Sequence, residues 1–303
     1  MAGYKGKPTA DREFRFPPDL KEDKEHTNRE DMLVSTQDTY DRIREELEAN
    51  KERITELLSG VMAELGFEAE GIDFVVEQIL EVLQSEENES IAANKVGDIL
   101  ESKFEVVARK LDGRAELIYS QIAMDIRDGN LLDFGCGDGK VSRHVEDNNP
   151  GVNDIVLYDI DDYRAESAKK YSFLDNKESI IEYAKEYGKF ETVLVVTVFH
   201  HCDEPEVEIE FLSRVAKRVI IIESVINETM SWGAQGVVDW LYNRGMHPGA
   251  SIPVPGNFKT VENWKEIFVK HGFETTRIDD LGQDLPIVPE YHVLFVLDKV
   301  ENN

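Results

Sequence analysis

Three glycines at alternate positions follow a short apolar segment near the middle of the chain. The segment reads Leu131-Leu132-Asp133-Phe134, and the glycines are Gly135, Gly137 and Gly139. Glycine tolerates positive φ and lets the backbone approach a ligand closely. If a helix begins directly after the loop, its free amide groups face the same ligand. The pattern therefore predicts a strand, a ligand-binding loop and a helix in succession.

Two acidic residues accompany this loop. Asp133 lies within the first apolar segment, and Asp159 ends the next one, residues 155–158, about 20 residues beyond the loop. A carboxylate at that place can accept hydrogen bonds from ribose hydroxyls. The glycine spacing lacks the later glycine of the dinucleotide fingerprint. Loop and acid together indicate an adenosine-type ligand lying across the carboxyl ends of parallel strands.

A pair of histidines ends another apolar run. Residues 192–198 are followed by Phe199, His200 and His201. Histidine titrates near neutral pH and could take a proton from a reacting group, although His200 could equally pack or donate a hydrogen bond. Adjacent side chains leaving a strand point to opposite faces, so we expect only one histidine to face the ligand. With Cys202 they show no metal-ligand spacing, which predicts no metal site.

Residues 227–260 form an insertion that is the expected place for recognition of a second ligand. It contains a probable helix over 230–242, and the strand before it contributes Glu223 as a further catalytic candidate. Apolar walls with a few polar groups suit a small organic molecule. Trp240 and Tyr242 could instead pack the insertion onto the sheet. The candidate ligand-binding residues here and on the last strand are Trp240, Tyr242, Asn243, His247, Tyr291 and His292.

After Gly129, strand-like runs alternate with helical stretches, as in an open parallel α/β sheet. We expect strands at 131–134, 155–158, 172–174, 192–198, 219–225, 275–278 and 291–297. Only a loop separates the last two, so they should form a hairpin with one antiparallel strand. Thr260 should cap a helix that ends at Gly272 and places Trp264 and Phe268 in the core.

The chain before Gly129 shows helical periodicity only. Residues 1–30 mix charges with prolines and are expected to form a mobile tail. Helices are expected from Ser35 or Thr36 onward, then over 72–83, 91–111 and 114–128. We therefore divide the chain into a tail (1–30), a helical region (31–112) and an α/β domain (113–303). In the helix at 72–83, the residues expected to face inward are Phe74, Val75, Ile79, Leu80 and Leu83.

The 303-residue chain is strongly acidic, with a formal net charge of −28 and 41% hydrophobic residues. Such a charge repels phosphate backbones, so nucleic acid is not an expected partner. Cys136 and Cys202 form no disulfide framework and suggest a reducing compartment. No apolar run approaches the ~20 residues that a membrane helix needs. We expect a soluble, cytoplasmic protein without a membrane partner.

The glycine loop, Asp159, the polar end of the 193–201 segment and the terminal hairpin together resemble the class I S-adenosylmethionine-dependent methyltransferases. The resemblance covers roughly residues 114–300. It implies an α/β fold with a seven-stranded, mostly parallel, Rossmann-like sheet and a terminal antiparallel hairpin, here preceded by an all-helical N-terminal extension. It also implies S-adenosylmethionine as cofactor and methyl transfer as the reaction.

The resemblance further implies roles for individual residues. Gly135 and Gly137 would lie against the methionine part of the cofactor, and Asp159 would hold the ribose. Ile160 would pack on the adenine, and Asp175 would border its edge unless it is only a turn residue. The cofactor-binding set that it implies is Asp133, Gly135, Cys136, Gly137, Asp159, Ile160, Asp175, Val198 and Phe199.

The preferred functional hypothesis is methylation of a small-molecule acceptor, on an oxygen, nitrogen or carbon atom that the sequence does not specify. His200, His201 and Glu223 are the catalytic candidates. The helical region and the insertion would form a cap that excludes water. The alternatives are a methyltransferase for protein or peptide side chains that docks on the helical region, and a non-catalytic S-adenosylmethionine-binding scaffold that forms a homodimer through its N-terminal helices.

Overall fold

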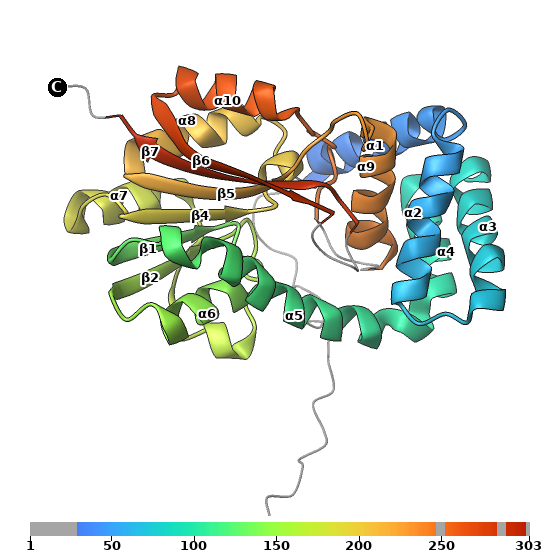
Figure 1. Cartoon of the computed structure of the whole chain (residues 1–303), viewed down its shortest axis with the longest axis horizontal. Coiled ribbons are helices and arrows are strands. Elements are labelled where there is room, and N and C mark those ends of the chain that lie inside the picture. Colours follow the sequence, from blue (N-terminus) through green and yellow to red (C-terminus); the bar gives the residue numbers. More distant parts are fainter. Residues whose placement is uncertain (1–28, 247–251, 284–288, 301–303) are drawn as a thin grey trace, which may run out of the picture.

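The predicted cofactor-binding segments follow strands of a single sheet and lie at the carboxyl edge of its parallel strands (Figure 1). In the computed structural model, which describes residues 29–246, 252–283 and 289–300, the strand order is β3-β2-β1-β4-β5-β7-β6. Strands β1 to β5 pair in parallel, and β7 is antiparallel to both β5 and β6. All expected strands and the terminal hairpin are confirmed. Their bounds are β1 Gly129–Phe134, β2 Val152–Tyr158, β3 Ser172–Leu174, β4 Thr192–Val196, β5 Arg218–Ser224, β6 Phe273–Gly282 and β7 His292–Lys299.

Helices cover both faces of the sheet, which explains why the central strands are almost continuously apolar. Alternate side chains of a strand point to opposite faces. Leu132 and Val193 belong to a buried cluster that includes residues of α7 (Lys177–Tyr187), α8 (Pro205–Val215) and α10 (Val261–Lys270). Leu131 and Leu194 belong to another cluster, with residues of α5 (Phe104–Ile122) and α6 (Lys140–Asn148). The result is a three-layer arrangement of helices, sheet and helices.

Helix α10 forms as the sequence predicts. The side chain of Thr260 accepts a hydrogen bond from the amide of Asn263, and Gly272 follows the helix with a φ of +73°. Trp264 and Phe268 are fully buried against the sheet. The N-cap at Thr260, the helix and its core residues are therefore all confirmed.

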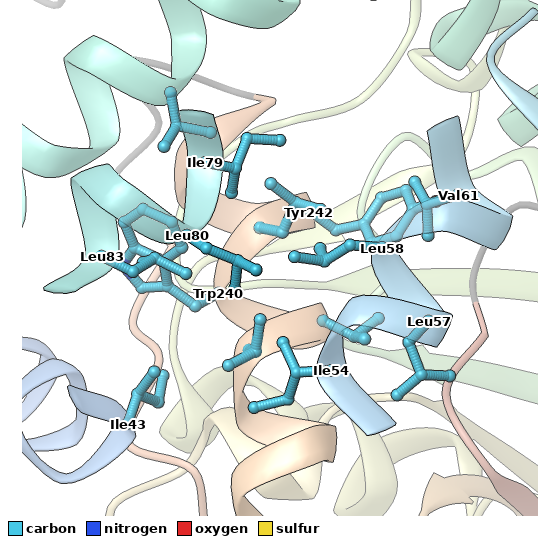
Figure 2. Close-up of a cluster of buried hydrophobic side chains, with 14 of the residues drawn as sticks. Ile43, Ile54, Leu57, Leu58, Val61, Ile79, Leu80, Leu83, Trp240 and Tyr242 are labelled. Atoms are coloured by element: carbon cyan, nitrogen blue, oxygen red, sulfur yellow. The ribbon is translucent and has the colours of Figure 1, made fainter. Parts of the chain in front are cut away.

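The helical region lies beside the carboxyl ends of the parallel strands (Figure 1). It consists of α1 (Arg29–Leu47), α2 (Lys51–Glu64), α3 (Ala69–Ser85) and α4 (Glu89–Leu100), and α5 leads from it to β1. The insertion adds α9 (Trp232–Trp240) and the π-helical turn η5 (Leu241–Gly245). Side chains from both parts share one hydrophobic core, in which Trp240 and Tyr242 meet residues of α1, α2 and α3 (Figure 2). We call this combined unit the cap.

Three expectations for the N-terminal helices are wrong. Helix α1 begins at Arg29, before the expected start at residue 35 or 36. The break expected near residue 113 is absent, because α5 passes through Gly113 and the chain breaks instead at the 3-10 turn 101–103. An exposed glycine costs a helix only about 1 kcal/mol, which packing of its neighbours can offset.

The third error concerns the buried stripe of α3. Phe74 is 63% exposed, and Val76 takes the inward position with Val75, Ile79 and Leu80. Spacings of three and four residues define a single helical stripe, and Phe74 lies beside it. Most of the expected tail and all of His247 fall outside the described residues. Within the described ranges, no helix combines the length and the apolar character needed to span a bilayer.

Candidate active site

The glycine loop joins β1 to α6 at the point where the strand order reverses, because β1 lies between β2 and β4. Gly135 and Gly137 both have positive φ, +77° and +52°. A Cβ atom on Gly135 would lie 2.4 Å from Cγ2 of Val198, so only glycine lets the loop approach this residue, the second after β4. A Cβ atom on Gly137 would meet no other atom within 4 Å. The backbone at Gly137 thus faces open space at the usual ligand crevice of such sheets.

Asp159 ties the end of β2 to this loop. Its Oδ2 accepts a hydrogen bond from the Gly137 amide at 2.8 Å, and its Oδ1 accepts one from the Ile160 amide at 2.8 Å. Burial raises the pKa of Asp159 to about 6, against the effect of these two bonds. A carboxylate can accept about four hydrogen bonds, so capacity for ribose hydroxyls remains. The neighbouring Ile160 side chain is 54% exposed and offers an apolar surface for a base.

Asp133 lies beneath the loop. It is buried, and its Oδ2 accepts a hydrogen bond from the hydroxyl of Ser142 on α6 at 2.6 Å. Burial raises the pKa of Asp133 to about 7. Cys136 is half-buried within the loop, and burial raises the pKa of its thiol. Asp133 is thus enclosed by protein, whereas Cys136 keeps part of its surface open.

Asp175, the remaining acid of the predicted cofactor set, lies in the turn between β3 and α7. It is exposed, and its Oδ1 accepts a hydrogen bond from the side chain of Asn176 at 2.7 Å. Asn176 in turn caps α7 by accepting from the amide of Ser179. These contacts fit the turn role of Asp175, and its predicted place at the edge of the adenine stays a prediction.

The two histidines lie on the same side of the chain, which corrects the expectation that they diverge. Strand β4 ends at Val196, Thr197 has a φ of +53°, and Phe199–His201 form the 3-10 turn η4. The alternation of a strand does not apply to such a turn. The ring centroids of His200 and His201 are therefore only 4.0 Å apart.

Carboxylates surround the histidine pair. Nδ1 of His200 is hydrogen-bonded to Oε1 of Glu223, which is fully buried at the end of β5. The other oxygen of Glu223 accepts from the Phe199 amide at 2.8 Å. On the opposite side, Asp239 of α9 lies with its Oδ1 3.7 Å from His200 Nε2 and 3.8 Å from His201 Nε2. Both oxygens of Glu223 are thus engaged by protein groups, one of which is the His200 ring.

Burial and neighbouring charges act together on the pKa values of the groups in this cluster. Burial disfavours a charged His200, but Glu223 and Asp239 outweigh it and raise the pKa of His200. Burial and the neighbouring His200 ring lower the pKa of His201. Glu290 lies near them, and its Oε2 accepts a hydrogen bond from the hydroxyl of Ser224. Burial would raise the pKa of Glu290, yet His292 and His200 lower it to about 2.

The predicted acceptor-binding residues have different positions. Trp240 is fully buried in the cap core and donates its indole N–H to Glu89 of α4 at 3.0 Å, so it packs the insertion onto the N-terminal helices rather than onto the sheet. Tyr242 is buried in the same core. Asn243 donates to Asp239 Oδ1 at 2.6 Å, and His292 is buried 3.6 Å from Glu290. The hydroxyl of Tyr291 donates to Asp280 at 2.6 Å.

Two carboxylates of the cluster were not among the residues finally assigned to the site from the sequence. Asp239 is fully buried on a helix whose other residues are mostly apolar, and Glu290 is buried just before β7. A carboxylate that is buried needs a partner, so an acid within an apolar helical stripe was the available signal. Its partner lies on a distant segment and could not be read from the sequence.

Comparison with known families identifies the domain that carries this loop. Residues 107–278 match the family model described as a methyltransferase domain, which is more than half of the chain. The chain belongs to this methyltransferase family. The assignment to class I S-adenosylmethionine-dependent methyltransferases is therefore confirmed, together with the expected fold. The matched region begins inside α5 and ends in β6, so it includes the glycine loop, the histidine pair and the insertion.

Solved structures with a similar fold share little sequence with this methyltransferase. A Haloferax volcanii chain solved with the methyltransferase activator Trm112 is 14% identical, with a TM-score of 0.41 over 64% of this chain and 97% of that one. The Burkholderia thailandensis 1,6-didemethyltoxoflavin-N1-methyltransferase, solved with 1,6-didemethyltoxoflavin and S-adenosylhomocysteine, is also 14% identical, with a TM-score of 0.42 over 65% and 86%. An Archaeoglobus fulgidus SAM-dependent methyltransferase is 16% identical, with a TM-score of 0.40 over 61% and 94%. No curated protein matches the sequence.

Proposed function

We propose that this protein transfers a methyl group from S-adenosylmethionine to a small-molecule acceptor. The observation that carries the proposal is the loop at Gly137, whose open backbone face adjoins a carboxylate that is fixed to the loop at the end of β2. This combination fits a ligand with a ribose and a chain that presses against the loop. When bound, the cofactor supplies a methyl group activated on a sulfonium.

The protein's own residues would hold that cofactor by position and charge. The backbone of Gly135 and Gly137 would contact its methionine part, and Asp159 would accept hydrogen bonds from the ribose. Ile160 would cover one face of the adenine, since its side chain is exposed beside Asp159. Val198, which touches the Gly135 side of the loop, would line the methyl-donor side. Such fixed contacts serve methyl transfer mainly by orienting the two reactants.

The cap supports a small acceptor over a polypeptide. The helical region and the insertion share one hydrophobic core, and this single unit lies beside the carboxyl ends of the strands (Figure 1). A unit of this kind can enclose a small molecule and exclude water from the reaction. The strongly acidic chain gives a basic polypeptide some electrostatic attraction, and we retain that acceptor class as an outcome of the test.

Of the three catalytic candidates, His201 is the most accessible. Its side chain is 17% exposed, whereas those of His200 and Glu223 are buried against one another. A residue that contacts the acceptor must be reachable by it. We therefore assign the position nearest the acceptor to His201, whose ring would border the acceptor, and a positioning role to His200 and Glu223.

The cofactor proposal is tested by calorimetric titration of S-adenosylmethionine into the full chain. Gly137→Ala should weaken binding at least tenfold, because the new methyl group would occupy the open face of the loop. Gly66→Ala is the matched control, because Gly66 also has a positive φ and open surroundings but lies in the helical region. Both variants should lose about 1 kcal/mol of stability from left-handed strain. Absence of binding by the natural sequence, or unchanged binding by Gly137→Ala, contradicts the proposal.

The acceptor class is tested with labelled S-adenosylmethionine in a cell extract. After incubation the reaction is divided by ultrafiltration into small molecules and macromolecules. A new labelled small molecule, separated from S-adenosylmethionine by chromatography and absent when the protein is left out, supports the proposal. Label on polypeptides that likewise depends on the protein supports the alternative acceptor. Cofactor binding without label in either fraction would favour the non-catalytic scaffold.

A further inference from the structure

Three side chains that commonly bind metals converge where the sheet meets the cap. His200 and His201 come from η4, and Asp239 comes from α9. One possible ligand atom from each residue lies within 4.8 Å of the other two. His200 and Asp239 are fully buried, and His201 is half-buried. The cluster is therefore enclosed by protein on most sides.

The Nδ1 atom of each histidine is already held by a hydrogen-bond acceptor. Nδ1 of His200 is bonded to Glu223, and Nδ1 of His201 lies 2.8 Å from the carbonyl oxygen of Pro253. A carbonyl oxygen only accepts, so Nδ1 of His201 carries the proton and its Nε2 holds a lone pair. Metal-binding histidines almost always donate their second N–H to a carboxylate or carbonyl in this way. Both Nε2 atoms are thereby directed at Asp239.

Asp239 lacks the partners that a buried carboxylate needs. Its Oδ1 accepts a hydrogen bond from Asn243, but its Oδ2 is buried and bonds to nothing in the described part of the chain. The two Nε2 atoms lie beyond hydrogen-bond distance of Oδ1, at 3.7 and 3.8 Å. In the metal-free protein the cation nearest this carboxylate is the His200 ring, whose Nε2 lies too far away for a hydrogen bond. A metal ion between the three groups would take the place of the His200 Nε2 proton, which leaves to solvent, and would bind the carboxylate and the Nε2 atom of both rings.

We propose that His200, His201 and Asp239 bind a divalent first-row transition-metal ion. Two imidazole nitrogens and one carboxylate oxygen suit zinc, iron or cobalt, whereas magnesium and calcium prefer oxygen ligands alone. Three protein ligands leave at least one coordination position open for a further oxygen or nitrogen atom. Glu223 and the Pro253 carbonyl act as the outer groups that orient the two rings.

The proposed site would also join two parts of the fold. The histidines follow β4, whereas Asp239 belongs to α9, whose other residues pack in the cap core with α1 and α2. An ion held by both parts binds the folded protein and not the unfolded chain, so it stabilises the folded state. This consequence is independent of the cofactor and can be measured without it.

The test uses the full chain without a polyhistidine tag, freed of metal with a chelator. Zinc is titrated by calorimetry, and cobalt is added in parallel to follow its d–d absorption. We expect one ion per chain, a rise in the melting temperature with zinc concentration, and a cobalt band typical of protein ligands. In His201→Gln and Asp239→Asn the affinity should fall at least 100-fold, and in Glu223→Gln by 10–100-fold. His144→Gln, which removes a histidine on α6, should bind as the natural sequence does.

Two outcomes would overturn the proposal. One is the absence of binding of either metal by the natural sequence, in which case the His200 ring itself bridges Glu223 and Asp239 as a cation. The other is equal binding by all variants, which would place the ion elsewhere. Circular dichroism checks that each variant is folded, and His201→Gln decides the result if Asp239→Asn is not. Because no S-adenosylmethionine is present, failure here leaves the proposed methyl transfer untouched.

Discussion

The cap should be held together by one buried charge cluster whose loss can be measured. Glu89 begins α4 and is buried. Its Oε1 accepts from the Arg244 Nε at 2.8 Å and from the Trp240 indole at 3.0 Å, and its Oε2 accepts from Arg244 at 3.0 Å. The Arg244 side chain is only 12% exposed. The carboxylate thus links α4 to the turn that follows α9.

Replacing Glu89 by glutamine should destabilise the protein by about 3 kcal/mol. The amide keeps an oxygen that can accept from Trp240, but it removes the negative charge that faces a nearly buried guanidinium. Removal of one partner from a buried ion pair costs about 3–5 kcal/mol, because the other charge stays buried. The lower end of this range applies here, since Arg244 keeps part of its exposure and further contacts.

A second substitution separates the stability that comes from the Glu89–Arg244 ion pair from the stability that each side chain contributes alone. Arg244→Met removes the guanidinium, and an apolar side chain of similar length can fill its place. The double variant Glu89→Gln/Arg244→Met should therefore recover at least about 2 kcal/mol relative to the additive sum of the single variants. Arg53→Met serves as the control, because it breaks the exposed Arg53–Glu56 pair on α2 and should change stability little.

The assay is urea unfolding followed by far-ultraviolet circular dichroism and by tryptophan fluorescence. Trp240 reports on the cap and Trp264 on the sheet core. If the single and double variants prove additive, the reasoning is refuted, because Glu89 and Arg244 would then contribute independently. A cost below 1 kcal/mol for Glu89→Gln would equally show that the guanidinium is solvated in the folded protein.

Three further predictions concern the sheet domain. Burial raises the pKa of Asp133 to about 7, so between pH 4 and 7 the folded protein holds a proton that the unfolded chain releases. The free energy of unfolding should therefore fall by on the order of 4 kcal/mol as pH rises from 4 to 7. In urea titrations at several pH values, Asp133→Asn should flatten this dependence. The hydrogen bond from Arg218 lowers the pKa of Asp298, so the ionised carboxylate stabilises the folded protein near neutral pH, and this stabilisation is lost as pH falls below 4. Asp298→Asn should therefore be less stable than the natural sequence at pH 7 and should lose less stability on acidification. Gly135→Ala should lower the melting temperature more than Gly137→Ala does, because only Gly135 faces Val198 at 2.4 Å.

The sheet and the glycine loop could be predicted because their signals are local. Each parallel strand is a short apolar run closed by a polar residue or glycine, and this pattern holds whatever the rest of the chain does. Asp159 follows from the same logic, since the end of β2 must lie beside the end of β1 once the two strands pair. Only its hydrogen bond to the Gly137 amide required the structure.

The convergence of the histidines on Asp239 could not be predicted from local patterns. It depends on the positive φ of Thr197, which ends β4 and turns the chain into η4. It also depends on how α9 packs, which the N-terminal helices determine through a shared core far away in sequence. The same distance explains why the sequence leaves Trp240 open between a ligand contact and a packing role: its partner Glu89 belongs to another segment.

Helix α9 connects the stability of the cap to the geometry of the histidine cluster. Its last turns carry Asp239, and the following η5 carries Asn243, whose side chain holds both the backbone carbonyl and Oδ1 of Asp239. Arg244 is the next residue, so a change in its ion pair with Glu89 acts on the segment that positions the carboxylate. Asp298 pairs with Arg218 at the opposite end of β5, away from the carboxyl edge of the sheet. A cap substitution at Glu89 should therefore disturb the cluster, whereas an equally destabilising substitution at Asp298 should leave it intact.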